Sequence, residues 1–525
     1  MRLPWLFLLG TILWGCAPKS NPGTLRNVLS YPMVARTATF DPGKVEDPDS
    51  MSIVQQVYEG LVALNEESQV APCLASKWEV LPDGRTYVFH LRRNVTFSNG
   101  KLLTAADFKR CLERNCTPAL ASHTARRFVS DIDGAQELLA GKSKELAGVK
   151  VIDAQTLQIT TGGPCAYFLQ KLVLPVAAVY DLQALGDPSK EISKIHEMVG
   201  TGPFKVTSVD RQEGVALVAN DLYREGRPRL DRIERPYVPE AATRLAMYRS
   251  GSLNNLRVER QDLARLEADP ALSKQIHYFR RPALWYFGIN CSVTPGFDKV
   301  QVRQALAMAI NRHRIVSEIL QGANPAAHGI LPPDIFGHRD SAKLFPYDPE
   351  TARKLLKLAG YPGGKGLPEM VIWYRANKPD MRLFAQAVGQ DLERNLGLKV
   401  SFKAADPAQM LAASSAKKVP FAATRWSADY LDPQDFLSVL LGSESTANFL
   451  DYRSRKFDDL CEEADRNTDP RARSSLYTRA EDLALHDAAI VPICFERDAE
   501  LIAPQVHGIR NTLVGHMPNS QVSIR

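Results

Sequence analysis

A lone carboxylate among aromatic rings is the feature of this sequence that most resembles a chemical site. Asp429 lies in the stretch TRWSADYLDPQDFL (424–437), between Trp426 and Tyr430, with no histidine or second acid directly beside it. General acid–base catalysis usually needs a positioned partner group, whereas a carboxylate by itself accepts charge-assisted hydrogen bonds from a cation. We therefore expect Asp429 either to receive a positively charged group or to cap its own turn before Pro433.

The motifs of common enzyme and cofactor sites are absent from the sequence. It contains no G-x-S-x-G elbow, no H-E-x-x-H helix and no G-x-G-x-x-G turn, and its ten histidines are scattered without ligand spacing. No C-x-x-C pair occurs either, so a zinc or redox site is poorly supported. We predict no catalysis, no cofactor and no metal site.

Composition describes an ordinary globular chain of more than one domain. The 525 residues are 45% hydrophobic and 24% charged, with a formal net charge of +6. This length exceeds what one hydrophobic core usually supports, so two or more domains are expected. No run of Lys or Arg suggests a nucleic-acid surface, and we predict no nucleic-acid partner.

The first residues predict export and a lipid anchor. A basic start and a short apolar run over residues 1–15 resemble a signal peptide, too short to span a bilayer comfortably. Cys16 follows a small residue, as in the bacterial lipoprotein cleavage box, and residues 16–24 form a polar tether. We expect lipidation at Cys16, with a plain secretory signal or a retained anchor as alternatives. No later stretch reaches about 20 apolar residues, so the body is expected to be soluble outside the cytoplasm.

Export would place the cysteines in a compartment that permits disulfides. Of the eight cysteines, Cys16 is assigned to the anchor, which leaves seven dispersed along the chain. Most are expected to be small buried side chains. One or two disulfides stay open, and their pairing does not follow from spacing.

Strand-like and helix-like patterns alternate along the chain without an obvious repeat. This predicts the α/β class with mixed sheets. We expect a hairpin over 78–92, a helix opened by the capping box Thr104–Asp107, helices near 302–310, 349–360, 383–397 and 471–486, strands over 398–402 and 489–495, and extended segments over 277–290 and 493–503.

Short signatures follow one another in a specific order. They are Asp41-Pro42, Val57-Tyr58-Glu59-Gly60-Leu61, Ala75-Ser76-Lys77-Trp78, Phe97-Ser98-Asn99-Gly100, Leu103-Thr104-Ala105-Ala106-Asp107-Phe108, Gly200-Thr201-Gly202-Pro203-Phe204, Phe287-Gly288-Ile289-Asn290, Val302-Arg303-Gln304-Ala305-Leu306 and Tyr347-Asp348-Pro349-Glu350. Together the chain resembles the extracytoplasmic solute-binding proteins of family 5, the peptide and nickel receptors of ABC importers. Each motif is weak alone; their order across the mature chain carries the resemblance.

The resemblance implies a two-lobed periplasmic-binding-protein fold (type II) with an extra family-typical domain. Lobe I would be discontinuous, over residues 25–65, 196–285 and 498–525. The extra domain would cover 66–195, and lobe II 286–497. The extended segments over 277–290 and 493–503 fit the crossovers between lobes, which would close around a ligand in a hinge motion.

The resemblance also implies a role for the aromatic-framed acid. In oligopeptide-binding members a Trp–x–x–Asp segment lies in the cleft and its Asp pairs with the free α-amino group of the peptide. Trp426 to Asp429, including Ser427, matches that segment. Tyr430 and Trp426 would be pocket wall or core, and Arg425 would pair with a ligand carboxylate or with Asp432 or Asp435.

The early loop of those members supplies main-chain contacts to the peptide. Here the matching loop contains Glu46, Asp47 and Pro48. Pro48 has no N–H, so one such bond is lost, and the added acids would favour a cationic end of the ligand.

The predicted function is therefore a lipid-anchored receptor, in the periplasm or at the cell surface. It would capture peptides and deliver them to an ABC permease and its ATPase, acting as a monomer. The alternatives are a receptor of the same fold for a nickel chelate, a sugar or another small solute, a sensor or folding helper without a permease, and an exported hydrolase.

Overall fold

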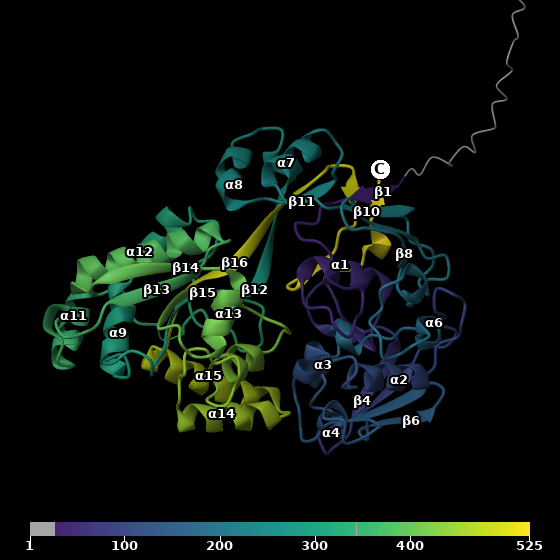
Figure 1. Cartoon of the computed structure of the whole chain (residues 1–525), viewed down its shortest axis with the longest axis horizontal. Coiled ribbons are helices and arrows are strands. Elements are labelled where there is room, and N and C mark those ends of the chain that lie inside the picture. Colours follow the sequence, from purple (N-terminus) through teal and green to yellow (C-terminus); the bar gives the residue numbers. More distant parts are fainter. Residues whose placement is uncertain (1–26, 343) are drawn as a thin grey trace, which may run out of the picture.

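The computed structural model describes residues 27–342 and 344–525 and has the predicted α/β architecture with mixed sheets (Figure 1). Parallel pairs such as β1 with β10 and β13 with β14 stand beside antiparallel pairs in the same sheets. The proposed signal peptide, Cys16 and the tether lie outside the described residues.

A six-stranded sheet contains two strands of unusual length. Its order is β11-β16-β12-β15-β13-β14, with bounds Asn255–Arg257, Ile490–Ile502, Ile276–Ile289, Phe421–Ser427, Met370–Arg375 and Val400–Ala405. β12 has 14 residues and β16 has 13, and they pair antiparallel from Ile276 opposite Leu501 to Gly288 opposite Ile490, with an irregularity between Arg280 and Leu284. In Figure 1 both run from the body containing β13, β14 and β15 toward α7 and α8.

Two four-stranded sheets lie in the other parts of the chain. One has the order β1-β10-β9-β8, with bounds Val28–Ser30, Arg232–Pro236, Gly214–Ala219 and Phe204–Asp210. The second has the order β4-β5-β7-β6, with bounds Ala75–Val80, Thr86–Leu91, Thr156–Thr160 and Val149–Asp153. Small two-stranded pairs join β2 (Val62–Leu64) to β3 (Val70–Pro72), β17 (Val506–His507) to β20 (Ser523–Ile524) and β18 (Asn511–Thr512) to β19 (Gly515–His516).

The helices cover these sheets. They are α1 Pro48–Val57, α2 Ala105–Asn115, α3 His123–Phe128, α4 Ala135–Leu139, α5 Phe168–Lys171, α6 Leu182–Leu185, α7 Ala241–Arg249, α8 Arg260–Glu267, α9 Val300–Ala309, α10 Arg312–Arg314, α11 Pro349–Leu358, α12 Pro379–Leu396, α13 Pro407–Ser415, α14 Arg455–Arg466 and α15 Pro470–Asp487. None of the helices in the described part of the chain combines the length and apolar character that a membrane span needs.

Local signals predicted several element ends correctly. The Asp107 carboxylate accepts the backbone N–H of Thr104 at 2.9 Å at the start of α2. Asp348 caps α11 by accepting the N–H of Thr351 at 3.0 Å, with Pro349 as its first residue. Gly397 ends α12 with a φ of 70°, a conformation that glycine adopts without a Cβ penalty.

The strand predicted at 489–495 is present but is longer than predicted. That segment and the extended segment at 493–503 form the single strand β16. Because β16 is buried along almost its whole length, it lacks the alternation of buried and exposed residues by which the end of a half-exposed strand is recognised.

Buried apolar side chains fall into separate groups along the chain. One group is drawn from residues 29–272 and 499–522, with Tyr430 as its member from the intervening segment. Other groups come mainly from residues 284–495. The first group includes both Leu29 and Phe89, so it does not separate the predicted extra domain from lobe I, and that division stays a prediction.

All seven cysteines of the described residues are free, and six of them are buried. Burial raises the pKa of several of these thiols, including Cys111 to about 12. They are therefore packing residues in this structure, as most were expected to be.

Candidate ligand-binding site

The end of β15 positions Asp429 beside the long strands. Trp426 lies opposite Leu284 of β12 in antiparallel register, and Ser427 lies opposite Ala283. One residue later the N–H of Ala428 donates to the carbonyl of Pro282 at 2.8 Å. The strand pairing thus fixes the backbone up to Asp429, while Ser427 is exposed at the strand end.

Asp435 is hydrogen-bonded to the segment that contains Trp426 and Asp429. Its Oδ2 accepts the indole N–H of Trp426 at 3.0 Å and the backbone N–H of Asp429 at 3.2 Å. The side chain is fully buried, and Oδ1 has no hydrogen-bond partner among the described residues. Burial, reinforced by the nearby Asp429, raises the pKa of Asp435 well above its usual value. Asp435 is a positioning residue that the sequence suggested only as a partner for Arg425.

Arg127 supplies a cation to Asp429 from a distant part of the chain. This residue of α3 forms an ion pair through Nη2 with Oδ2 of Asp429. Its guanidinium carbon lies 5.9 Å from the Trp426 ring centroid and 5.3 Å from that of Phe128, within the range of cation–π attraction. The Arg127 side chain is 47% exposed and that of Asp429 is 28% exposed, but the Asp429 Oδ2 atom itself is buried.

The ionisation of Asp429 reflects opposing neighbours. Burial raises the pKa of Asp429, Arg127 lowers it, and Glu46 raises it further by repulsion. The net direction is upward. The negative charge of Asp429 is therefore incompletely balanced by its neighbours, and an added cation would stabilise the ionised form.

The ring of Tyr430 packs against aromatic side chains from a distant part of the chain. Its ring lies 6.1 Å from that of Tyr167 in a stacked arrangement and 6.3 Å from Phe128 edge to face. Lys171 Nζ lies 5.3 Å from the Tyr430 ring centroid, and the tyrosine hydroxyl donates to Gln434. Tyr430 is buried in this contact, which identifies it as packing rather than as an exposed pocket wall.

The early acidic loop lies at the start of α1. Asp47 is the N-cap and accepts the N–H of Ser50 at 2.8 Å, while Pro48 is the first helical residue. The carboxylate of Asp47 is thus engaged by its own helix. Glu46 is exposed and acts on Asp429 through its charge.

Arg425 belongs to a different cluster. Its Nη1 contacts Oε2 of Glu496 on β16, and Glu496 also accepts from Arg257 and from the indole of Trp285, each at 3.1 Å. Burial alone would raise the pKa of Glu496, but Arg425 and Arg257 lower it to about 2. The alternative pairing of Arg425 with Asp432 is not observed, because Asp432 forms two hydrogen bonds with Arg473 at 2.6 and 2.9 Å.

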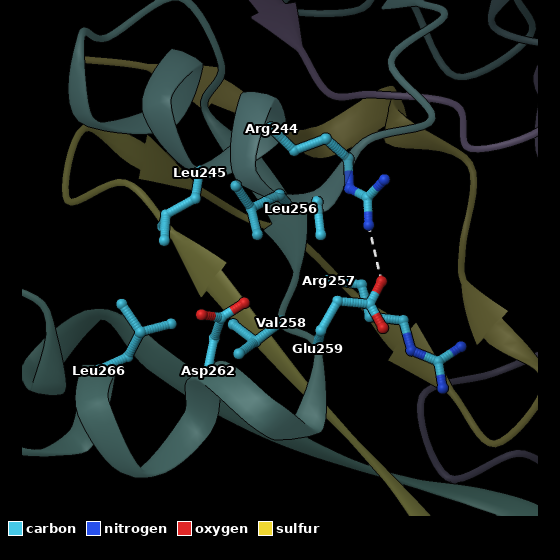
Figure 2. Close-up of a pocket in the computed structure, with 9 residues that line it drawn as sticks. Arg244, Leu245, Leu256, Arg257, Val258, Glu259, Asp262 and Leu266 are labelled. Carbon is cyan, nitrogen blue, oxygen red and sulfur yellow. Dashed lines mark hydrogen bonds and ion pairs between the residues drawn. The ribbon is translucent and has the colours of Figure 1, made fainter. Parts of the chain in front are cut away.

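A separate hollow lies between α7 and α8 and is too small for a ligand. Figure 2 shows its lining, which includes Leu245, Leu256 and Leu266, and the ion pair of Arg244 with Glu259 at 2.6 Å. Its volume is about 10 Å³, room for about one water molecule. Within the described ranges, no group of three or more His, Cys, Asp or Glu is arranged to hold a metal ion.

Comparison with known proteins gives consistent matches over most of the chain. Residues 69–448 match the family described as bacterial extracellular solute-binding proteins, family 5 middle. Heme-binding protein A of Haemophilus influenzae is 30% identical, covering 93% of this chain and 91% of the relative. The periplasmic oligopeptide-binding protein OppA of Escherichia coli is 28% identical, covering 90% and 87%. The glutathione-binding protein GsiB of Shigella dysenteriae is 30% identical, covering 87% of each chain.

The fold also matches solved structures. The crystal structure of the oligopeptide-binding protein OppAIV from Borrelia burgdorferi superposes with a TM-score of 0.80. The match covers 95% of this chain and 100% of that chain at 24% sequence identity, so it supports the fold and carries no information on the ligand.

Proposed function

This chain belongs to the bacterial extracellular solute-binding proteins of family 5, and from that premise we propose that it captures peptides by their free amino end. It is a non-catalytic, extracytoplasmic substrate-binding protein of an ABC importer. The names of the relatives give heme, oligopeptides and glutathione as their ligands. The ligand of this chain is therefore inferred from the residues of its own site. In the proposal, Asp429 holds the ammonium group of the peptide.

The observation that carries the proposal is the ion pair between Asp429 and Arg127. It joins the end of β15 to α3, two segments about 300 residues apart, and the acid is partly buried. A carboxylate that already takes N–H donors from across this contact can take those of an ammonium group in the same way. The guanidinium of Arg127 therefore stands in for the cargo's cation.

Neighbouring carboxylates are less suited to this role. Asp47 caps α1, Asp432 is paired with Arg473, and Asp435 is fully buried under Trp426. The acids compared are those of the early loop at residues 46–47 and of the stretch 424–437. Among them, Asp429 and Glu46 are the ones that reach solvent near each other. Backbone pairing to an extended peptide would add hydrogen bonds that read no side chain, each worth about 0.5–1.5 kcal/mol.

The long strands suit a hinge between lobes. We assign lobe I to 25–65, 196–285 and 498–525, the extra domain to 66–195 and lobe II to 286–497. β12 and β16 cross between the first and last of these, and their pairing is irregular between Arg280 and Leu284. Closure would then bring α3 and Asp429 together, and a ligand drives it to the extent that it binds the closed form better.

Removal of the charge at Asp429 tests the amine contact. We expect Asp429→Asn to weaken a free-amine tripeptide about 10- to 100-fold, the loss of one charge-assisted hydrogen-bond set. The N-acetylated tripeptide should bind both proteins equally and weakly. Calorimetric titration measures both, and Asp221→Asn, which removes an exposed charge elsewhere, is the control. Equal losses for both peptides would remove Asp429 from the amine site.

We further propose that Cys16 carries the lipid anchor and that the receptor works as a monomer with a permease and its ATPase. The support is the leader pattern in the sequence, because Cys16 lies outside the described residues. Cys16→Ser should move the protein from the membrane fraction to the soluble fraction. An unchanged distribution would contradict the anchor.

A further inference from the structure

Asp435 is a fully buried carboxyl group that an amine at Asp429 does not touch. It is the first residue of η6, a π-helix over Asp435–Val439, and π-helical turns are rare and frequent at functional sites. Its Oδ2 accepts two N–H groups, whereas Oδ1 has no hydrogen-bond partner among the described residues. An ionised oxygen that is buried without a partner is costly. The surroundings therefore favour the neutral acid, with its proton on Oδ1.

The helices packed against η6 do not supply a counter-ion for Asp435. These helices are α14 and α15. Asp465 of α14 is itself an acid, and it accepts the hydroxyl of Ser438 at 3.1 Å. Arg473 of α15 is bound to Asp432 through two hydrogen bonds at 2.6 and 2.9 Å. The positive charge on this side of η6 is therefore already paired.

The groups on the side of the candidate site leave the same imbalance. They are Arg127 paired with Asp429, Lys171 paired with Asp131 at 2.6 Å, the exposed Glu46, and the Tyr430 hydroxyl, which donates to Gln434. Both cations of this set have a carboxylate partner. Burial, reinforced by the charge of Asp429, raises the pKa of Asp435 well above its usual value, and Arg127 offsets the rise only in part.

An ammonium group at Asp429 changes this balance. Arg127 contacts Oδ2 of Asp429, which leaves Oδ1 as the oxygen for the cargo. The ammonium group therefore adds a positive charge beside the two acids while Arg127 stays in place. Salt and water screen a charge weakly in a partly buried site, and a nearby positive charge favours the ionised form of an acid.

We propose that Asp435 is a positioning residue that holds a proton in the empty receptor and releases it when the cationic end of the cargo occupies Asp429. The O–H bond of Asp435 breaks, its electron pair stays on the carboxylate, and the proton passes to water or buffer. The new carboxylate then lies behind Asp429 as a second negative charge. This inference rests on the proposed role of Asp429 and goes beyond it by linking capture to pH.

The direction of the pH dependence follows from the proton count. The empty receptor binds more protons than the loaded one, so affinity rises with pH between the pKa values that Asp435 has in the two states. One released proton corresponds to at most a tenfold gain in affinity per pH unit. The useful range runs from about pH 5 to about pH 7.5, above the usual pKa of a carboxyl group and below that of a peptide amine.

Calorimetric titration with trialanine counts the protons. Receptor stripped of co-purified ligand by unfolding and refolding is titrated in two buffers that differ in their enthalpy of ionisation. The difference between the two apparent binding enthalpies gives the number of protons released. We expect release of a large part of one proton and an affinity that rises about three- to tenfold per pH unit.

Two variants locate the proton. Asp435→Asn keeps an oxygen for the two N–H donors but has no proton to release, so proton release should vanish and the affinity should become independent of pH. Asp465→Asn is the matched control, because Asp465 also contacts η6 and burial raises its pKa to about 6. It should release as many protons as the unmodified protein.

Infrared spectra supply a measurement that needs no variant. The carbonyl band of protonated carboxyl groups should weaken when trialanine is added to the unmodified receptor at neutral pH. An unchanged band overturns the inference, including the case in which Asp435→Asn does not fold.

The outcomes separate this inference from the proposed function. Amine-dependent binding without proton release, or with release that survives Asp435→Asn, overturns the inference and leaves the role of Asp429 intact. Release that is lost in Asp465→Asn assigns the proton to Asp465 and overturns it as well. Equal binding of trialanine and N-acetyl-trialanine, or failure of trialanine to bind, overturns both.

Discussion

Two arginine–carboxylate clusters join segments of this molecule that are distant in the sequence, and they are built differently. Glu496 is 7% exposed and receives Arg425, Arg257 and the Trp285 indole. Asp429 is 28% exposed and receives Arg127. Both lie next to β12, one on the adjoining strand β16 and one after β15.

The pKa shifts of the two acids have opposite directions. Two arginines lower the pKa of Glu496 to about 2 against the effect of burial, while burial and other acids raise the pKa of Asp429 despite Arg127. A carboxylate with more donors than it needs stabilises the fold. A carboxylate with fewer donors is stabilised further by an added cation. The direction of the pKa shift therefore separates a structural ion pair from an exchangeable one.

The largest expected effect is on stability. Glu496→Gln leaves Arg257 and Arg425 without their shared counter-charge and should lower the free energy of unfolding by about 3 kcal/mol. Asp429→Asn should change it by less than about 1 kcal/mol, because the pair is partly exposed and the raised pKa of Asp429 shows that Arg127 does not offset the cost of burying its charge. Urea denaturation at neutral pH measures both. Similar losses in the two variants would erase the distinction between the clusters.

Acid should act selectively on the Glu496 cluster. The pKa of Glu496 is lowered from 4.5 to about 2, so its contribution is complete above pH 4.5 and is lost as the pH falls toward 2. The loss amounts to about 3 kcal/mol. The difference in unfolding free energy between the unmodified protein and Glu496→Gln should shrink over this range. A difference independent of pH would show that the glutamate is not held in its charged form.

The smallest expected effect is on closure without ligand. An exposed pair is worth about 0.2–1 kcal/mol, so Arg127→Gln should lower the closed-to-open ratio about 1.5- to 5-fold. Single-molecule energy transfer between dyes on the two predicted lobes reports this ratio, with Arg126→Gln as the control. An unchanged ratio would mean that the contact of Tyr430 with Tyr167 and Phe128 holds the parts together without the ion pair.

Sequence reasoning was most successful where structure depends on near neighbours. The cap of α11 by Asp348 and the left-handed end of α12 at Gly397 follow from residues within one turn of each other. The order of family signatures also predicted the family and its fold. For the site, the aromatic frame indicated that Asp429 is unusual, and its proposed ligand role stays a prediction.

What the sequence by itself determined is thus the set of elements, the family and the one acid to examine. Tertiary structure decided which charges meet. Nothing near Asp429 in the sequence points to Arg127, and nothing near Arg425 points to Glu496, because partners about 300 and 70 residues away are brought together only by the packing of whole elements. Ion pairing depends on distance in space and on exposure to water, and neither quantity is written in local spacing.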